Sequence, residues 1–143
     1  MKLFAYILFC LLFGFSGNSE IYAQTNASKK EIHEFFYNQK IQITYREGEV
    51  IYGTYYFIEV HYCPNGYGLY GNTVKKTVLG NEQKTNWQEY GTWKAIAQNG
   101  VNGIQLQPTS GYPQFYPIYK LQNGDIFVGE GITIIKQGTA TCQ

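Results

Sequence analysis

Apolar and polar residues alternate along most of the chain after about residue 40, which is the pattern of β-strands with one buried and one exposed face. The alternation is clearest over residues 87–96, where Trp87 and Trp93 fall on the same face as Glu89. These are the only tryptophans of the protein, and β-favouring Tyr90 and Thr92 lie between them. We therefore predict one long strand here, with a face that buries two indole rings.

Turn signals separate the alternating runs roughly every eight to twelve residues. Pro64-Asn65-Gly66, Asn99-Gly100 and Asn123-Gly124-Asp125 are the strongest of these signals. Only one helix is indicated, whereas a parallel α/β fold needs repeated crossover helices. We expect an all-β fold, an antiparallel barrel or sandwich of eight or nine strands. The predicted strands cover residues 40–46, 50–62, 67–70, 74–79, 87–96, 104–107, 114–121, 126–128 and 132–136, with a polar loop at 81–86.

The first two runs form a predicted hairpin around Glu47-Gly48-Glu49. Gly53 lies near the start of the second run, where a glycine inside a strand pattern favours a bend or bulge.

A short helix is predicted over residues 29–38, ahead of the strands. Ser28 followed by Glu31 fits a capping box, and Ile32, Phe35 and Phe36 lie at helical spacing. The apolar edge is narrow, so we expect this helix to cover the sheet as a plug or lid.

The N-terminal residues 1–23 have the composition of a secretory signal peptide: Lys2, an apolar run from Leu3 to Phe15, and a more polar stretch that ends at Ala23. Cleavage after Ser19 or after Ala23 fits the pattern. The apolar run is shorter than the roughly 20 residues of a membrane span. We expect a secreted or periplasmic single domain, residues 24–143, without a stable membrane span; a retained membrane anchor is the alternative.

Charge and cysteine content fit an exported domain. The net charge is +1 and the basic residues are scattered, so nucleic acid is not an expected partner. Of three cysteines, Cys63 and Cys142 lie outside the predicted signal peptide. In an oxidising compartment an even count favours pairing, and we predict a Cys63–Cys142 disulfide. Two free thiols or an intermolecular bridge are the alternatives.

Candidate catalytic residues are few. Ser28 fits a helix cap, Ser110 has no nucleophile-elbow pattern around it, and Asp125 occupies a turn. The glutamates do not define a facing pair of the kind that glycosidases use. No phosphate-binding loop or dinucleotide motif is present, and we expect neither an enzyme nor a cofactor.

Glu59, His61 and Cys63 alternate along one predicted strand and so share a face. A carboxylate, an imidazole and a thiolate could bind a soft transition metal. The predicted disulfide removes the thiolate, so we favour an outward polar face and predict no metal site.

Aromatic residues are abundant, with fourteen tyrosines, nine phenylalanines and two tryptophans. Tyrosine has an apolar face and a polar tip, which suits a barrel interior, a ligand site or a protein-contact surface. We predict a small apolar or amphipathic ligand inside the barrel or at its mouth. The alternative is a protein partner that docks on an exposed 112–119 surface over a solid core. The candidate binding residues are Trp87, Trp93, Tyr112, Phe115, Tyr116 and Tyr119.

Residues 50–135 carry a resemblance to a known family. The segments Glu89-Tyr90-Gly91-Thr92-Trp93 and Gly103-Ile104-Gln105-Leu106, with a late stretch over 119–131, resemble the lipocalin-like small barrels of bacterial envelopes, including the NlpE-type barrel. The resemblance implies a ligand-holding barrel. The Gly-x-Trp motif lies mid-chain instead of on the first strand, and Cys63 is not part of a Cys-x-x-Cys motif, so no functional residue is transferred.

Overall fold

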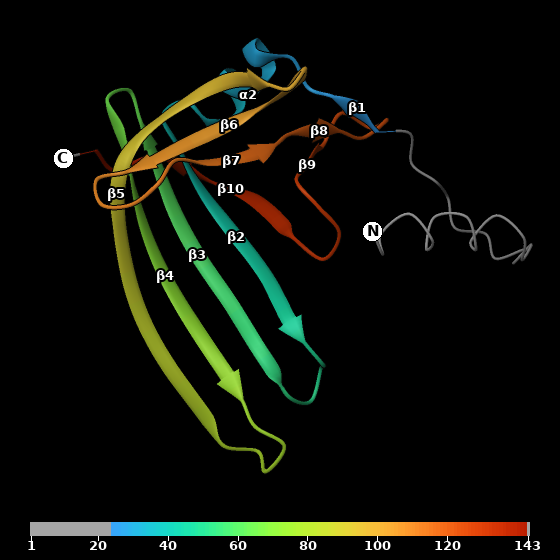
Figure 1. Cartoon of the computed structure of the whole chain (residues 1–143), viewed down its shortest axis with the longest axis vertical. Coiled ribbons are helices and arrows are strands. Elements are labelled where there is room, and N and C mark those ends of the chain that lie inside the picture. The colour runs from blue at the N-terminus through green and yellow to red at the C-terminus, as the bar shows by residue number, and fades with distance from the viewer. Residues whose placement is uncertain (1–23, 143) are drawn as a thin grey trace, which may run out of the picture.

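The computed structural model describes residues 24–142, so the predicted signal peptide lies outside the described residues. Two antiparallel sheets and one helix make up this part of the chain (Figure 1). Within it, no helix has the length and apolar character needed to cross a membrane. The elements are β1 (Thr25–Asn26), α2 (Lys29–Phe36), β2 (Gln39–Gly48), β3 (Gly53–Cys63), β4 (Gly66–Lys76), β5 (Glu82–Gln98), β6 (Val101–Pro108), β7 (Gln114–Pro117), β8 (Tyr119–Lys120), β9 (Ile126–Phe127) and β10 (Thr133–Thr139).

The main sheet has seven strands in the order β10-β2-β3-β4-β5-β6-β7 and curls into a half-barrel. A small sheet, β1-β8-β9, lies near α2 at one end of it (Figure 1). The prediction of an antiparallel all-β fold with one short N-terminal helix is confirmed. The curled sheet is a half-barrel, so its inner face stays open on one side.

The core lies at the end of the half-barrel that α2 covers. Ile32 and Phe36 of the helix are buried there against Ile41, Val60 and Ile118. Fully burying side chains of this size stabilises the fold by about 1.5–3 kcal/mol each, so these few contacts hold the helix on the sheet. The prediction of a helix that plugs the sheet matches this packing.

The capping box of α2 is confirmed. The Ser28 hydroxyl accepts from the Glu31 backbone N–H at 3.2 Å, and the Glu31 carboxylate accepts from the Ser28 N–H at 2.8 Å. The helix ends at Phe36, two residues earlier than predicted. Tyr37 leaves the helical conformation with ψ 123°, and Asn38 follows with φ +55°.

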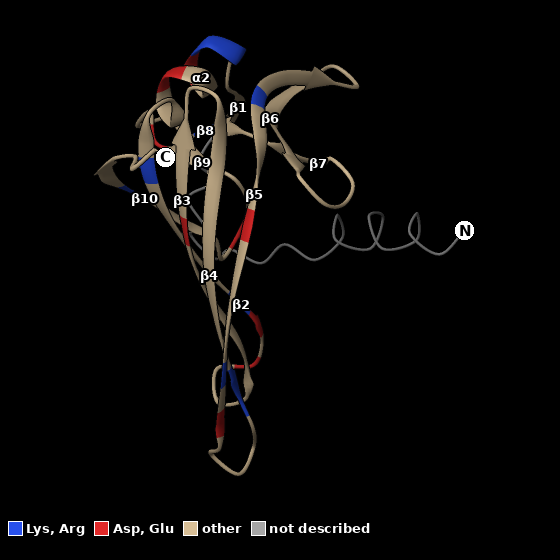
Figure 2. Ribbon diagram, turned by 90° about the vertical axis from the view of Figure 1, so that its left-hand side faces the viewer, with Lys and Arg blue, Asp and Glu red and all other residues tan. Residues whose placement is uncertain are grey.

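Beyond the core, β2–β5 continue as a single layer that we call the blade, residues 44–57 and 72–86. Figure 2 shows these strands edge-on, with charged residues scattered along them. None of the blade residues is buried. The blade ends in two hairpin tips, where the side chains of Ile51 and Leu79 are 77% and 88% exposed.

Three predictions within this region were wrong. Strand β4 is continuous where two short strands were predicted, because the Trp87 indole lies over Gly71 and fills the place of its side chain. The predicted polar loop at 81–86 is largely the beginning of β5, whose residues 82–86 pair with 72–76 of β4. Gly53 makes no bulge; it closes the hairpin opposite Gly48.

The predicted strand over 114–121 is divided between the two sheets. Strand β7 pairs with β6, and β8 pairs with β1 and β9. The break falls at Ile118, which is fully buried and whose N–H donates to the Asn102 carbonyl at 3.2 Å. Pro117, just before it, has no N–H with which to continue the ladder.

Candidate ligand site on the inner face of the half-barrel

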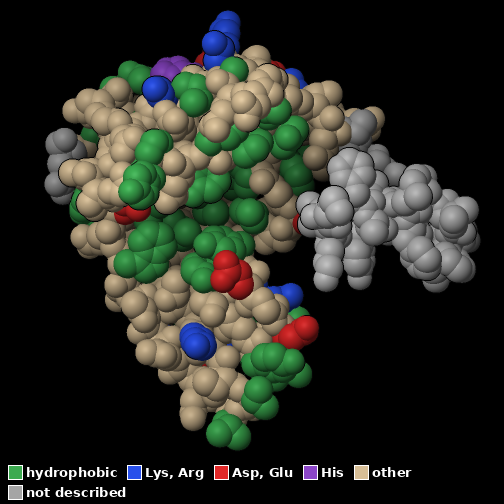
Figure 3. Space-filling model, in the orientation of Figure 1, with side chains coloured by type: hydrophobic (Ala, Val, Ile, Leu, Met, Phe, Trp, Pro, Cys, Tyr) green, Lys and Arg blue, Asp and Glu red, His purple; other side chains and the backbone are tan. Residues whose placement is uncertain are grey.

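The inner face of the sheet is lined with aromatic and aliphatic side chains. The alternation predicted for β5 is confirmed: Trp87, Glu89 and Trp93 are half-buried, whereas Gln88 and Tyr90 between them are exposed. Figure 3 shows hydrophobic side chains gathered in the hollow of the half-barrel. This hollow is the candidate ligand site.

Trp93 closes the end of the hollow next to the helix. Its indole N–H donates to the Cys63 carbonyl at 2.7 Å, and its ring stacks on His33 and meets Tyr62 edge-on, both at 5.4 Å between centroids. With its polar atom satisfied and its ring held on two sides, Trp93 is fixed in place. Trp93 therefore forms the floor of the hollow, and we do not expect its ring to move when a ligand binds.

Glu89 and Tyr67 form the polar centre of the inner face. The Tyr67 hydroxyl donates to the Glu89 carboxylate at 2.5 Å, and Tyr67 is only 4% exposed. Burial, together with this carboxylate, raises the pKa of Tyr67 well above its usual range, so the phenol stays protonated and keeps donating. A carboxylate has further lone pairs, so Glu89 can accept from a ligand as well.

Tyr116 of β7 is paired with Ile104 on the inner face; it is 45% exposed, and its hydroxyl donates to the Gln114 side chain at 2.5 Å. Burial raises the pKa of Tyr116, and the charge of Glu89 raises it further. Tyr116 in turn adds to the effect of burial on the pKa of Tyr62 and Tyr67. Glu89 therefore acts on phenol groups from two strands, Tyr67 of β4 and Tyr116 of β7.

A stacked pair of tyrosines borders the hollow where the blade begins. The Tyr45 and Tyr56 rings are parallel, with centroids 4.3 Å apart, and the Tyr56 hydroxyl donates to the Glu47 carboxylate at 2.9 Å. Burial, then Glu47 and then Tyr116, raise the pKa of Tyr45. The inner site, as we use the term, consists of Tyr45, Tyr67, Trp87, Glu89 and Tyr116.

The candidate binding residues from the sequence are only partly brought together. Trp87, Trp93 and Tyr116 share the inner face. Phe115 lies with its ring against Gly103 on the opposite face of β7. Tyr112 is 89% exposed in the loop before β7, and Tyr119 belongs to the small sheet.

Sequence reasoning placed Glu89 on the tryptophan face but did not select it, and it did not select Tyr45 or Tyr67. The two-residue period of β5, which places Glu89 on the same face as Trp87 and Trp93, was the signal that could have selected it. No local pattern marks Tyr45 or Tyr67, because their role depends on how strongly the sheet curls.

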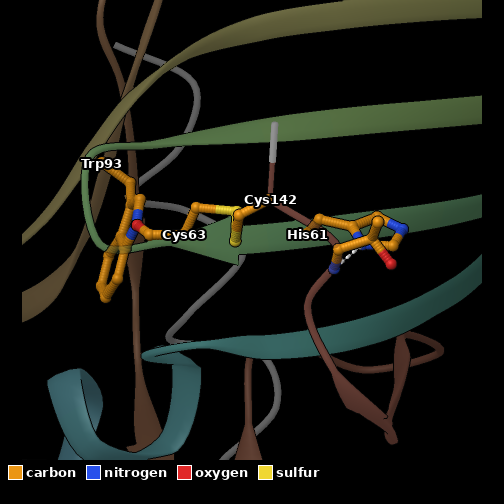
Figure 4. Close-up of a disulfide and its surroundings, with 5 residues drawn as sticks. His61, Cys63, Trp93 and Cys142 are labelled. Atoms are coloured by element: carbon orange, nitrogen blue, oxygen red, sulfur yellow. Dashed lines mark hydrogen bonds between the residues drawn. A yellow bond between two sulfur atoms is a disulfide. The ribbon is translucent and has the colours of Figure 1, made fainter.

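The outer face carries Glu59, His61 and Cys63 in a row, as the alternation predicts. Cys63 is joined to Cys142 in a disulfide with 5.8 Å between the Cα atoms, so the predicted pairing is confirmed (Figure 4). His61 is buried, because the C-terminal tail covers it: the Thr141 N–H donates to Nδ1 at 2.8 Å, and Nε2 contacts the Glu59 carboxylate at 2.8 Å. The expected outward polar face is thus partly covered.

Because the Cys63 sulfur is in the disulfide, it is not a thiolate ligand. Within residues 24–142, no group of three or more histidine, cysteine or acidic side chains is placed to hold a metal ion.

Comparisons with known protein families, with curated proteins and with solved structures found no match to this chain. The resemblance to lipocalin-like envelope barrels therefore stays a prediction, and the geometry of the inner site is the basis for a functional proposal.

Proposed function

We propose that this protein is an exported, non-catalytic binding protein of lipocalin-like type that holds a small amphipathic ligand on the inner face of its half-barrel. The carrying observation is that the bonded Glu89 carboxylate and Tyr67 hydroxyl lie on the inner face of the half-barrel among apolar and aromatic side chains. Ligand sites commonly combine an apolar lining with a few convergent polar groups in this way.

The ligand lies at the mouth of the hollow in this proposal. Ile32, Phe36 and Trp93 fill the end next to the helix. The apolar part of the ligand packs on Trp87 and Tyr45, and a hydroxyl or ammonium group of the ligand donates to Glu89. An ammonium group would be stabilised both by a charge-assisted hydrogen bond to the carboxylate and by cation–π contact with the tyrosine rings.

Tryptophan fluorescence tests the proposal directly. The exported domain is titrated with dodecylamine, lauric acid, dodecanol and haem, and we expect a saturable change that is strongest for dodecylamine. Trp87→Phe should remove most of the signal, because the Trp93 indole is held by its hydrogen bond to Cys63 and by the rings of His33 and Tyr62.

Glu89→Gln should weaken dodecylamine binding about tenfold, the loss expected when a charged hydrogen-bond acceptor becomes neutral. Glu82→Gln, which changes an exposed carboxylate near a blade tip, is the matched control and should bind as the wild type does. A flat titration with all four probes, or equal loss in both variants, would reject the inner site.

A further inference from the structure

The outer face of the sheet has a second hollow, which shares with the inner site only Tyr67, whose hydroxyl bonds to Glu89. It has a volume of about 340 Å³ and lies over β3, β4 and β5 beside the disulfide. This is within the size range of small-molecule sites. We call it the outer hollow; its lining includes His61, Gly68, Tyr70, Tyr90, Thr92 and Thr141.

A glycine makes this hollow. Gly68 is paired with His61 on one side and with Tyr90 on the other, so it lies between two large side chains. A Cβ at Gly68 would lie 3.3 Å from the Tyr90 ring and 3.5 Å from the Tyr70 hydroxyl, and any longer side chain would occupy the hollow. Glycine is unfavourable inside a strand, yet here it lets the Tyr90 ring and the Tyr70 hydroxyl approach the backbone and form the walls of the hollow.

The walls form a corner instead of a parallel slot. Tyr70 stands perpendicular to Tyr90, with centroids 6.1 Å apart at 89°, and perpendicular to His61, at 5.7 Å and 88°. Tyr90 is 47% exposed, so its ring is accessible to a ligand. A flat aromatic ligand is held best between two parallel faces, whereas a puckered ring can rest its C–H groups on one face and fill a corner.

The rim of the outer hollow offers hydrogen-bond donors and acceptors, and among the described residues no lysine or arginine lines it. Nδ1 of His61 accepts from the Thr141 N–H and therefore carries no proton, so the neutral ring donates from Nε2 to Glu59. Asn65, Thr92 and Thr141 line the opening. Hydroxyl and amide groups both donate and accept, which matches a ligand rich in hydroxyl groups.

We propose that the outer hollow binds one neutral sugar ring, free or at the end of an oligosaccharide. The ring lies with its C–H face on Tyr90 above Gly68, and its hydroxyl groups bond to the rim. This site is on the opposite face of the sheet from the inner site and does not depend on it.

Amide NMR of the isotopically labelled domain tests the proposal, with the methyl glycosides of glucose, galactose, mannose and N-acetylglucosamine as probes at millimolar concentration. We expect at least one to give saturable shifts at the Gly66, Gly68 and Gly91 amides, which line the hollow. Cyclohexylmethanol, a ring of similar size with one hydroxyl group, should give none.

Two variants remove the site in different ways. Gly68→Leu fills the hollow and Tyr90→Ala removes its wall, and each should weaken sugar binding about tenfold or more. Phe57→Ala is the matched control, since Phe57 is an outer-face aromatic of similar exposure, 45%, outside the hollow. Each variant is first checked for a dispersed amide spectrum.

The absence of saturable shifts with every glycoside would overturn the proposal, as would equal binding of cyclohexylmethanol. Sugar binding that persists in Tyr90→Ala but is lost in Phe57→Ala would also overturn it. Glu89→Gln should leave sugar binding unchanged, so failure at one site is distinguishable from failure at the other.

Discussion

At the scale of single residues, the contact between Gly71 and Trp87 joins β4 to β5. A Cβ built on Gly71 would fall 2.1 Å from the Trp87 ring, so no other residue fits while the indole keeps its place. An aromatic ring over a glycine on the neighbouring strand covers the exposed backbone and restores the packing that the glycine lacks. Both partners are therefore needed for an unbroken β4.

We predict that Gly71→Ala lowers the free energy of unfolding in urea by about 1–3 kcal/mol, the usual cost of overpacking. The displaced indole should also shift its fluorescence maximum. Gly68→Ala is the matched control on the same strand, because its new methyl group meets an exposed tyrosine ring that can move. Equal destabilisation by both substitutions would contradict the special role of Gly71.

At the scale of elements, α2 depends on an acid-sensitive cap. Hydrogen bonds from Lys120, then from the Ser28 backbone and hydroxyl, lower the pKa of Glu31 from 4.5 to about 2. A lowered carboxyl pKa adds stability above the unfolded value and loses it as the pH falls through the folded value. The cap is therefore fully effective above about pH 4.5 and is lost progressively toward about pH 2.

The corresponding prediction concerns acid unfolding followed by far-ultraviolet circular dichroism. Glu31→Gln should be less stable than the wild type at neutral pH, and the difference should shrink between about pH 4.5 and 2. Glu34→Gln, which changes an exposed carboxylate of the same helix, is the control. A difference between wild type and Glu31→Gln that stays constant with pH would show that the cap does not titrate.

Elements whose signals are local could be predicted from the sequence. The capping box needs only Ser28 and Glu31, and the faces of β5 follow from its period. Residues 82–86 could not be placed, because both faces of the blade are exposed and a strand there has no apolar alternation. The predicted break of β4 near Gly71 was wrong because the Trp87 ring that covers this glycine comes from another strand, which the local sequence does not show.

At the scale of the whole molecule, the sequence predicted the antiparallel class, with a barrel or a sandwich as its form, and the disulfide, but it left open whether the sheet closes. The disulfide followed from the count of cysteines left outside the signal segment. The composition of the inner site did not follow, because it depends on the curl of the sheet, which brings Tyr116 of β7 to the same inner face as Glu89 of β5. Sequence period assigns faces to each strand, but it does not say which strands meet across a barrel.

The disulfide ties the C-terminal tail to the centre of the sheet. It joins residues 79 apart, so the chain-entropy model gives a stabilisation of about 4 kcal/mol. We predict that a reducing agent, or Cys142→Ser, lowers the denaturant midpoint and weakens glycoside binding at the outer hollow, because Thr141 is then no longer held against His61.

The control is the Cys142→Ser variant, whose denaturant midpoint should be the same with and without the reducing agent. An unchanged midpoint for the reduced wild type would show that the tail is held by other contacts.

The blade has a consequence for motion within a single strand. Strand β5 begins in an exposed layer at a hairpin tip and packs against the helix further along, at Trp93, so its amides span two very different surroundings. Hydrogen–deuterium exchange should be fast near Glu82 and slow near Trp93, with a gradient between them, because the tip can fray by local opening while the covered end exchanges only when the whole domain unfolds.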